Sequence, residues 1–68
     1  SMNVAFASII NMGNRAKEDA KRLAQVTEDA LKAIKAGDED KCLKDLQEAE
    51  ELAKKLNGFA DKLYSELV

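Results

Sequence analysis

Residues 33–46 read AIKAGDEDKCLKDL, and this stretch decides whether the chain is one long helix or two. Lys32 and Lys35 precede Gly37, and three acidic residues follow it at 38–40. Cations stabilise the carboxyl end of a helix and anions its amino end, because each offsets the partial charge of the helix dipole there. Glycine is the residue most often found just after a helix ends. The stretch therefore predicts a turn at Gly37, with the aspartate that follows it capping a second helix.

Apolar residues on both sides of this stretch have the spacing of helices that pack along one face. Before the turn they step by threes and fours through Phe6, Ile9, Gly13, Ala16, Ala20, Leu23, Thr27, Ala30 and Ile34. After the turn they run through Cys42, Leu46, Ala49, Ala53, Leu56, Ala60, Leu63 and Leu67. Each is a heptad stripe, widened by flanking apolar residues that include Val26 and Ala33 before the turn and Leu43 after it. The heptad phase breaks at Gly37, which supports a turn there, and no strand-like alternation occurs.

We therefore expect an all-α fold, an antiparallel helical hairpin with helices over about 3–36 and about 38–67 and the turn at Gly37. Residues 1–68 are expected to form a single helical domain, with Ser1 a cloning scar. Folding about Gly37 places Gly13 opposite Lys62 and Gly58 opposite Lys17. Both glycines are interpreted as kinks or close-approach points inside long helices. The alternative is that they end the helices and let short terminal helices fold back.

The size of the chain points to self-association. A chain of 68 residues buries only about 60% of the surface that its unfolded form exposes. Small scaffolds usually need a disulfide, a metal or oligomerisation, and this chain has a single cysteine and no histidine. Two helices also cannot cover apolar faces this wide. We therefore expect a homodimer in which two hairpins pair into a four-helix bundle.

Composition narrows the class of function. The chain is 46% hydrophobic with a net charge of −2, which argues against disorder, and it lacks a run of about 20 apolar residues that would span a membrane. The segment NVAFASIINM (3–12) lacks the features of a signal peptide, so a cytoplasmic location and no membrane contact are expected. No catalytic motif, cofactor loop or metal-ligand set is found. We expect neither an enzyme nor a cofactor.

Two surfaces are candidates for function. The first is an apolar association face, which would pair the hairpins or dock a second protein. Its predicted members are Phe6, Ile9, Ile10, Leu23, Leu31, Ile34, Leu46, Leu52, Leu56, Phe59 and Leu63. The second is a basic strip that would contact a nucleic-acid backbone, made of Arg15, Lys17, Lys21 and Arg22. Glu18 and Asp19 dilute this strip, and no aromatic residue interleaves it for base stacking.

Two other features have an ordinary structural interpretation beside a functional one. Cys42 lies on the second apolar stripe, so we interpret it as a small core residue rather than a reactive thiol, for which the chain offers no histidine base. Residues 38–51 hold seven acids against two bases, which either cap and solvate the second helix or dock a basic partner.

The length, the central turn, the two heptad arms and the ending FADKLYSEL (59–67) resemble those of small helical-hairpin proteins. That class includes plasmid copy-number regulators, which are antiparallel four-helix dimers that bind paired RNA loops, and secretion-apparatus co-chaperones. The likeness is one of class. We expect a non-enzymatic interaction or regulatory protein of the adaptor or co-chaperone type, acting as a self-associating hairpin. The alternative is an RNA- or DNA-binding regulator that uses the basic strip.

Overall fold

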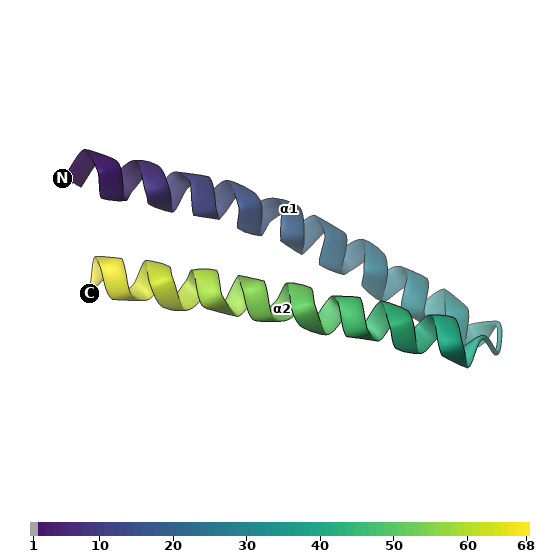
Figure 1. The fold of residues 1–68 in the computed structure, drawn as a ribbon. Helices are drawn as coiled ribbons and strands as arrows, with labels where there is room; N and C mark the ends of the chain where they lie inside the picture. Colours follow the sequence, from purple (N-terminus) through teal and green to yellow (C-terminus); the bar gives the residue numbers. More distant parts are fainter. Residues whose placement is uncertain (1) are drawn as a thin grey trace.

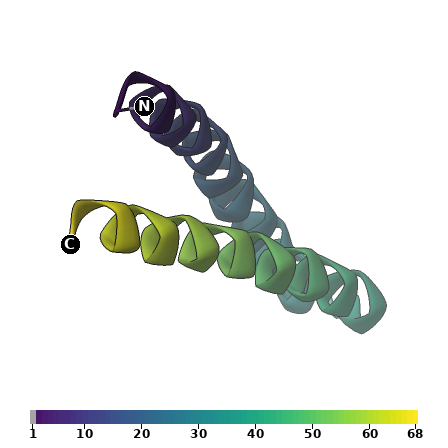
Figure 2. The same ribbon diagram turned by 60° about the vertical axis from the view of Figure 1, so that its left-hand side comes forward.

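The protein is a hairpin of two long helices (Figure 1). The computed structural model describes residues 2–68, and residues 2–4 by their backbone alone. Helix α1 spans Met2–Lys35 and α2 spans Glu39–Leu67, so the all-helical prediction is confirmed, with bounds that agree within a residue. The interpretation of Ser1 lies outside the described residues. The hairpin measures 53 × 16 × 13 Å, and its helices diverge from the turn toward the two termini (Figures 1 and 2).

The turn follows from the residues around Gly37. Gly37 has a φ of +79°, a backbone conformation that favours glycine. Its N–H donates to the carbonyl of Ile34 at 3.1 Å, and the N–H of Asp38 donates to the carbonyl of Ala33 at 2.9 Å. These two bonds form a Schellman motif, which satisfies carbonyls that the helix end leaves unpaired. The Asp38 carboxylate then accepts from the N–H of Lys41 at 3.1 Å and caps α2, as the sequence predicts.

Neither of the other two glycines interrupts a helix. Gly13 lies within α1 and Gly58 within α2, so the prediction that both lie inside long helices is confirmed. The predicted register is wrong by almost one helical turn. A Cβ atom built on Gly13 would lie 3.6 Å from the ring of Phe59, whereas the sequence placed Gly13 opposite Lys62. The reason is the Schellman motif, because its bonds reach back to Ala33 and centre the reversal near residue 36 rather than beyond Gly37.

The core between the helices is narrow and made mostly of small side chains. Its buried members are Ala16, Val26, Ala30, Ala33, Cys42 and Leu52. Cys42 packs in one cluster with Ala30 and Ala33, as expected for a small core residue. Small residues at a helix contact let the two backbones approach closely, and larger residues such as Leu23 and Leu56 are half-buried beside them.

Each apolar stripe consists of rows of residues that are seven positions apart, and the structure corrects which of these rows lie between the helices. The buried contact of α1 combines the row of Ala16 and Ala30 with the row of Val26 and Ala33, which the sequence placed at the flank. The predicted stripe instead combined the row of Ala16 with a different row, which is exposed in the structure. Its exposed members are Phe6, Ala20, Thr27 and Ile34. Half of each predicted stripe therefore lies outside the hairpin. This displaced half forms the surface described next.

Candidate interaction surface

Large apolar side chains remain exposed along both helices. Phe6 is 67% exposed, Leu43 59% and Leu67 74%. Together with others that are about half-exposed or more, they make up what we call the uncovered face: Phe6, Ile10, Leu31, Ile34, Leu43, Leu46, Tyr64 and Leu67. A contiguous exposed apolar patch of this kind marks an interaction site more often than an ordinary surface.

Helix geometry places these residues on one side of the hairpin. On α1 they fall in two heptad rows, of which one lies four sequence positions after the row of buried Ala16 and the other lies one position after it. On α2 they fall in the two rows that have the same offsets from the row of buried Cys42. In both helices they are therefore displaced in the same rotational sense from the contact line. Antiparallel helices are related by a local two-fold axis, so equal displacements fall on the same side. The uncovered face therefore lies along one side of the hairpin.

A shallow groove near the turn gives direct evidence that this face joins the two helices. Its lining combines Ile34 from α1 with Leu43 and Leu46 from α2. Buried Cys42 forms part of the lining, and Glu39 stands at its edge. The groove is predominantly apolar, so it offers contacts for hydrocarbon rather than for a charged ligand.

Side-chain size varies along the uncovered face. Large residues gather near the turn, around Ile34 and Leu46, and near the open end, around Phe6 and Leu67. The middle of the strip holds exposed small residues, namely Ala20, Ala24, Ala53 and Ala60. Lys17 and Glu50 occupy the same rows in that middle region and are also exposed. The strip therefore has two bulky apolar ends and a low centre with two charges of opposite sign.

The opposite side of the hairpin is polar and is held by an ion pair. Arg22 Nε lies 2.7 Å from Glu48 Oε2, and Arg22 Nη2 donates to Glu48 Oε1 at 3.0 Å. Of the ion pairs in the described part of the chain, this bidentate one alone links α1 to α2. The hydrogen bond and the opposite charge lower the pKa of Glu48 and raise that of Arg22. Both side chains remain about half-exposed, so the pair fixes register more than it adds stability.

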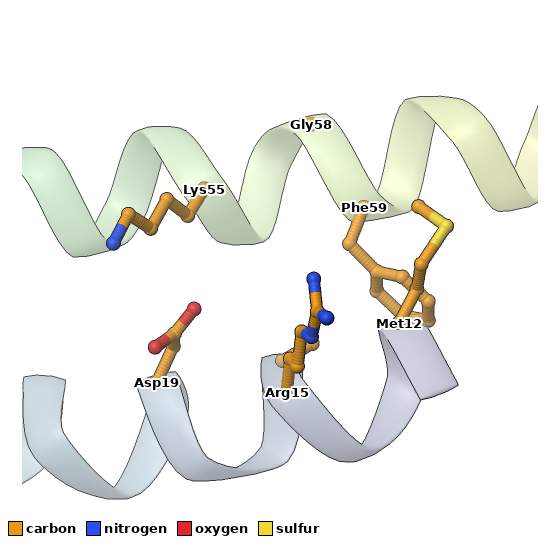
Figure 3. A pocket seen from close by; sticks show the side chains of 7 residues that line it. Met12, Arg15, Asp19, Lys55, Gly58 and Phe59 are labelled. Carbon is orange, nitrogen blue, oxygen red and sulfur yellow. The ribbon is translucent and has the colours of Figure 1, made fainter. Parts of the chain in front are cut away.

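The same polar side carries a second open groove, shown in Figure 3. Met12 and Phe59 form its apolar end, with Arg15, Asp19 and Lys55 along its edges. The Arg15 guanidinium is directed across the groove toward α2 (Figure 3). These charged groups are at the surface, and the groove has no buried polar atom that would orient a small ligand.

The predicted association face is divided by the structure into two sets. The first set is buried or half-buried between the helices, where it forms the hairpin's own core: Ile9, Leu23, Leu52, Leu56, Phe59 and Leu63. The second set stays exposed on the uncovered face: Phe6, Ile10, Leu31, Ile34 and Leu46. Three exposed members were missed by the sequence reasoning, namely Leu43, Tyr64 and Leu67. Leu67 lies on the predicted second stripe, and that position was the signal that would have found it.

The four cations of the predicted basic strip do not form one free patch. Arg22 pairs with Glu48, and Lys21 lies 3.4 Å from Glu18. Arg15 lines the groove on the polar side, whereas Lys17 belongs to a row of the uncovered face. A nucleic-acid backbone would therefore meet two cations that already have carboxylate partners.

Other kinds of site receive no support within residues 2–68. No group of three or more potential metal-ligating side chains comes together in this part of the chain. Neither α1 nor α2 is long and apolar enough to cross a membrane. Comparison with models of known protein families, with curated proteins and with solved structures found no match for this chain.

Proposed function

We propose that this chain is a non-enzymatic interaction protein that acts as a self-associated pair of hairpins. In this pairing the uncovered faces of two copies meet and complete a four-helix bundle. The single observation that carries the proposal is the uncovered face, which lies along one side of both helices and has bulky side chains at both ends of the hairpin. An adaptor or regulator then presents the remaining charged surfaces of the bundle to another protein.

The energetic reason is the same as for folding of the hairpin itself. Fully burying a Leu, Ile or Phe side chain contributes about 1.5–3 kcal/mol, and the side chains of the uncovered face keep about half or more of their surface in water. The fully buried residues inside the hairpin are three alanines, a cysteine, a valine and one leucine, and the other large side chains between the helices are only half-buried. Pairing through the uncovered face would remove further apolar surface from water.

The proposal is tested by the solution mass, measured by light scattering over a range of protein concentrations. A dimer has twice the 7.5 kDa mass of the chain. The variant Ile34→Lys with Leu46→Lys places two charges in the groove near the turn and is expected to be monomeric, because paired faces would bury both charges. Circular dichroism checks that the variant keeps its helices.

A matched control adds the same charge elsewhere. Gln25 and Ser65 are exposed on rows that point away from the uncovered face. Gln25→Lys with Ser65→Lys should leave the dimer intact. If the wild-type chain is a helical monomer at all concentrations, or if both double variants dissociate equally, self-association through this face is wrong. Docking of the same face to a different protein is then the interpretation that stands.

A further inference from the structure

We propose that two copies pair with their turns at the same end, so that α1 of each copy lies against α2 of the other. This inference rests on the proposed self-association and specifies its geometry. It is carried by the charges that border the uncovered face, which differ in sign between the two helices. Two ways of pairing the hairpins are sterically similar, and these charges favour one of them.

Two symmetric pairings bring the uncovered faces together. A two-fold axis along the length of the hairpin keeps the turns together and sets α1 against α2 of the second copy. A two-fold axis across the hairpin puts the turns at opposite ends and sets α1 against α1 and α2 against α2. Both pairings are closed dimers, and both make antiparallel contacts between copies. Apolar burial alone does not separate them, because both place bulky ends against bulky ends.

The charges along the edge of the uncovered face do separate them. We call these charges the rim, meaning the charged residues in the rows of the face and in the next row outward on each helix. The rim of α1 holds Lys17, Lys21, Glu28 and Lys35, a net charge of +2. The rim of α2 holds Glu39, Asp40, Glu50, Lys54 and Asp61, a net charge of −3. When the turns are at the same end, the positive rim of α1 meets the negative rim of α2 of the second copy. When the turns are at opposite ends, each rim meets the rim of the same charge.

The register of the hairpin brings specific rim residues to the same level. Because Gly13 lies opposite Phe59, residues at one level along the hairpin have numbers that add up to about 72. Lys21 therefore shares a level with Glu50, and Lys35 lies within about a turn of Glu39. With the turns together these levels coincide between copies, so Lys21 faces Glu50 of the second copy. Charged residues beside an apolar seam select partner and orientation in coiled coils in this way.

Existing contacts leave these residues available. Lys21 and Glu50 each have an exposed partner in their own helix, Glu18 at 3.4 Å and Lys54 at 3.3 Å. Exposed pairs of this kind are weak and exchange readily. One like-charged meeting remains, between Lys17 and Lys54 of the second copy. Lys54 also lies 3.8 Å from Glu51, so two carboxylates of its own helix offset that repulsion.

The test measures distances between spin labels in the dimer. Each label is attached to a single introduced cysteine in a Cys42→Ala background, either Ala36→Cys at the turn or Ser65→Cys at the open end. Both positions are exposed and lie off the uncovered face. With the turns together, two labels at residue 36 are separated only by widths of the order of the hairpin's 16 and 13 Å. With the turns apart, they approach its 53 Å length.

Mixed samples supply the matched control. Dimers that carry one label at residue 36 and one at residue 65 should give the long distance, while two labels at residue 65 give a short one. The reverse pattern, or a mixture of short and long distances for identical labels, overturns the proposed orientation while leaving self-association intact. A labelled protein that is monomeric by light scattering overturns self-association itself. The two proposals therefore fail in distinguishable ways.

A charge exchange tests the physical cause. Lys21→Glu places like charges at the Lys21–Glu50 level in both halves of the dimer and should raise the dimer dissociation constant by about tenfold. Glu50→Lys should do the same. An equimolar mixture of the two variants should recover wild-type affinity as a heterodimer, because each level then pairs opposite charges. If mixing gives no recovery, these two residues do not meet across the dimer.

Discussion

Val26 is the most completely buried side chain of the hairpin, at 1% exposure, and it lies in a row that the sequence assigned to the flank of the stripe. Val26→Ala removes two methyl groups from the contact between α1 and α2. We expect the free energy of unfolding to fall by about 1.5 kcal/mol, at roughly 0.8 kcal/mol for each buried carbon. Denaturant unfolding measures this loss. Gln25→Ala, one position earlier and exposed, should change it by less than about 0.5 kcal/mol.

At the residue scale the Arg22–Glu48 pair also predicts a pH dependence. Its hydrogen bond lowers the pKa of Glu48 in the folded state below the usual value of 4.5, which the unfolded chain retains. A carboxyl with a lowered folded pKa stabilises the fold fully above its unfolded pKa, and that contribution disappears as the pH falls through the folded pKa. The melting temperature of the wild type should therefore fall more on acidification than that of Glu48→Gln.

The difference between the two proteins should be small, because both side chains of the pair are about half-exposed to solvent and salt. It should shrink further in 1 M salt, where screening weakens exposed pairs. Equal acid sensitivity of the wild type and Glu48→Gln at low salt would show that the pair does not form in solution.

Gly37 and Gly58 give opposite predictions at the scale of the helix. Gly37→Ala places a side chain at a φ of +79° and should lower the free energy of unfolding by about 1–2 kcal/mol. Gly58 lies inside α2 with nothing within 4 Å of a Cβ atom built on it. Gly58→Ala should therefore raise the free energy of unfolding by up to about 1 kcal/mol, because alanine favours the helix. Denaturant unfolding of both variants decides whether α2 is continuous, since loss of stability in Gly58→Ala would place a break there.

The helices and the turn were predictable because their signals are local. Gly37 and the capping Asp38 lie next to each other in the sequence, and heptad spacing needs only one helix at a time. The register depends instead on hydrogen bonds that reach back to Ala33 and Ile34, and these shift the point of reversal by about one and a half residues. A shift of that size moves facing residues by nearly a turn, which is why Gly13 meets Phe59.

The candidate site was only partly predictable for a related reason. Each helix carries three adjacent apolar rows, and apolarity alone does not say which two face the neighbouring helix. The rows that pack include Asp19 and Asp45, which the sequence pattern disfavours as core. Asp45 is accommodated because Lys41 lies 3.0 Å from its carboxylate at the edge of the contact. Leu43 and Tyr64 lie in a further row, which also holds the polar residues Glu50 and Asn57, so the sequence did not predict that row as part of the association face.

At the scale of the whole molecule, one side of the hairpin is apolar and the other polar. The large apolar side chains are divided between the two sides of the helix contact, since Leu52 is buried between α1 and α2 whereas Phe6 and Leu43 stay exposed. In a self-sufficient small fold most of the large apolar side chains would be buried. The exposed apolar side chains would become buried if this side of the hairpin formed part of a larger core, as in the proposed bundle.

This arrangement separates two leucines of α2 in a way that thermal unfolding can detect. Leu52 is 7% exposed between the helices, and Leu43 is 59% exposed on the uncovered face. If the bundle forms, unfolding is coupled to dissociation, so the melting temperature of the wild type should rise with protein concentration. Leu52→Ala should lower the free energy of unfolding by about 2 kcal/mol or more through a cavity in the hairpin itself. Its effect should be present at every concentration.

Leu43→Ala is the matched substitution, and its effect should depend on association. In dilute solution, where hairpins are monomeric, the exposed leucine contributes little and the variant should melt close to the wild type. At concentrations where the wild type is dimeric, Leu43→Ala should melt at a lower temperature, because the lost side chain belonged to the joint core. A gap between the two proteins that widens with concentration therefore locates Leu43 in an interface. A wild-type melting temperature that is independent of concentration would instead mean that the uncovered face stays in water.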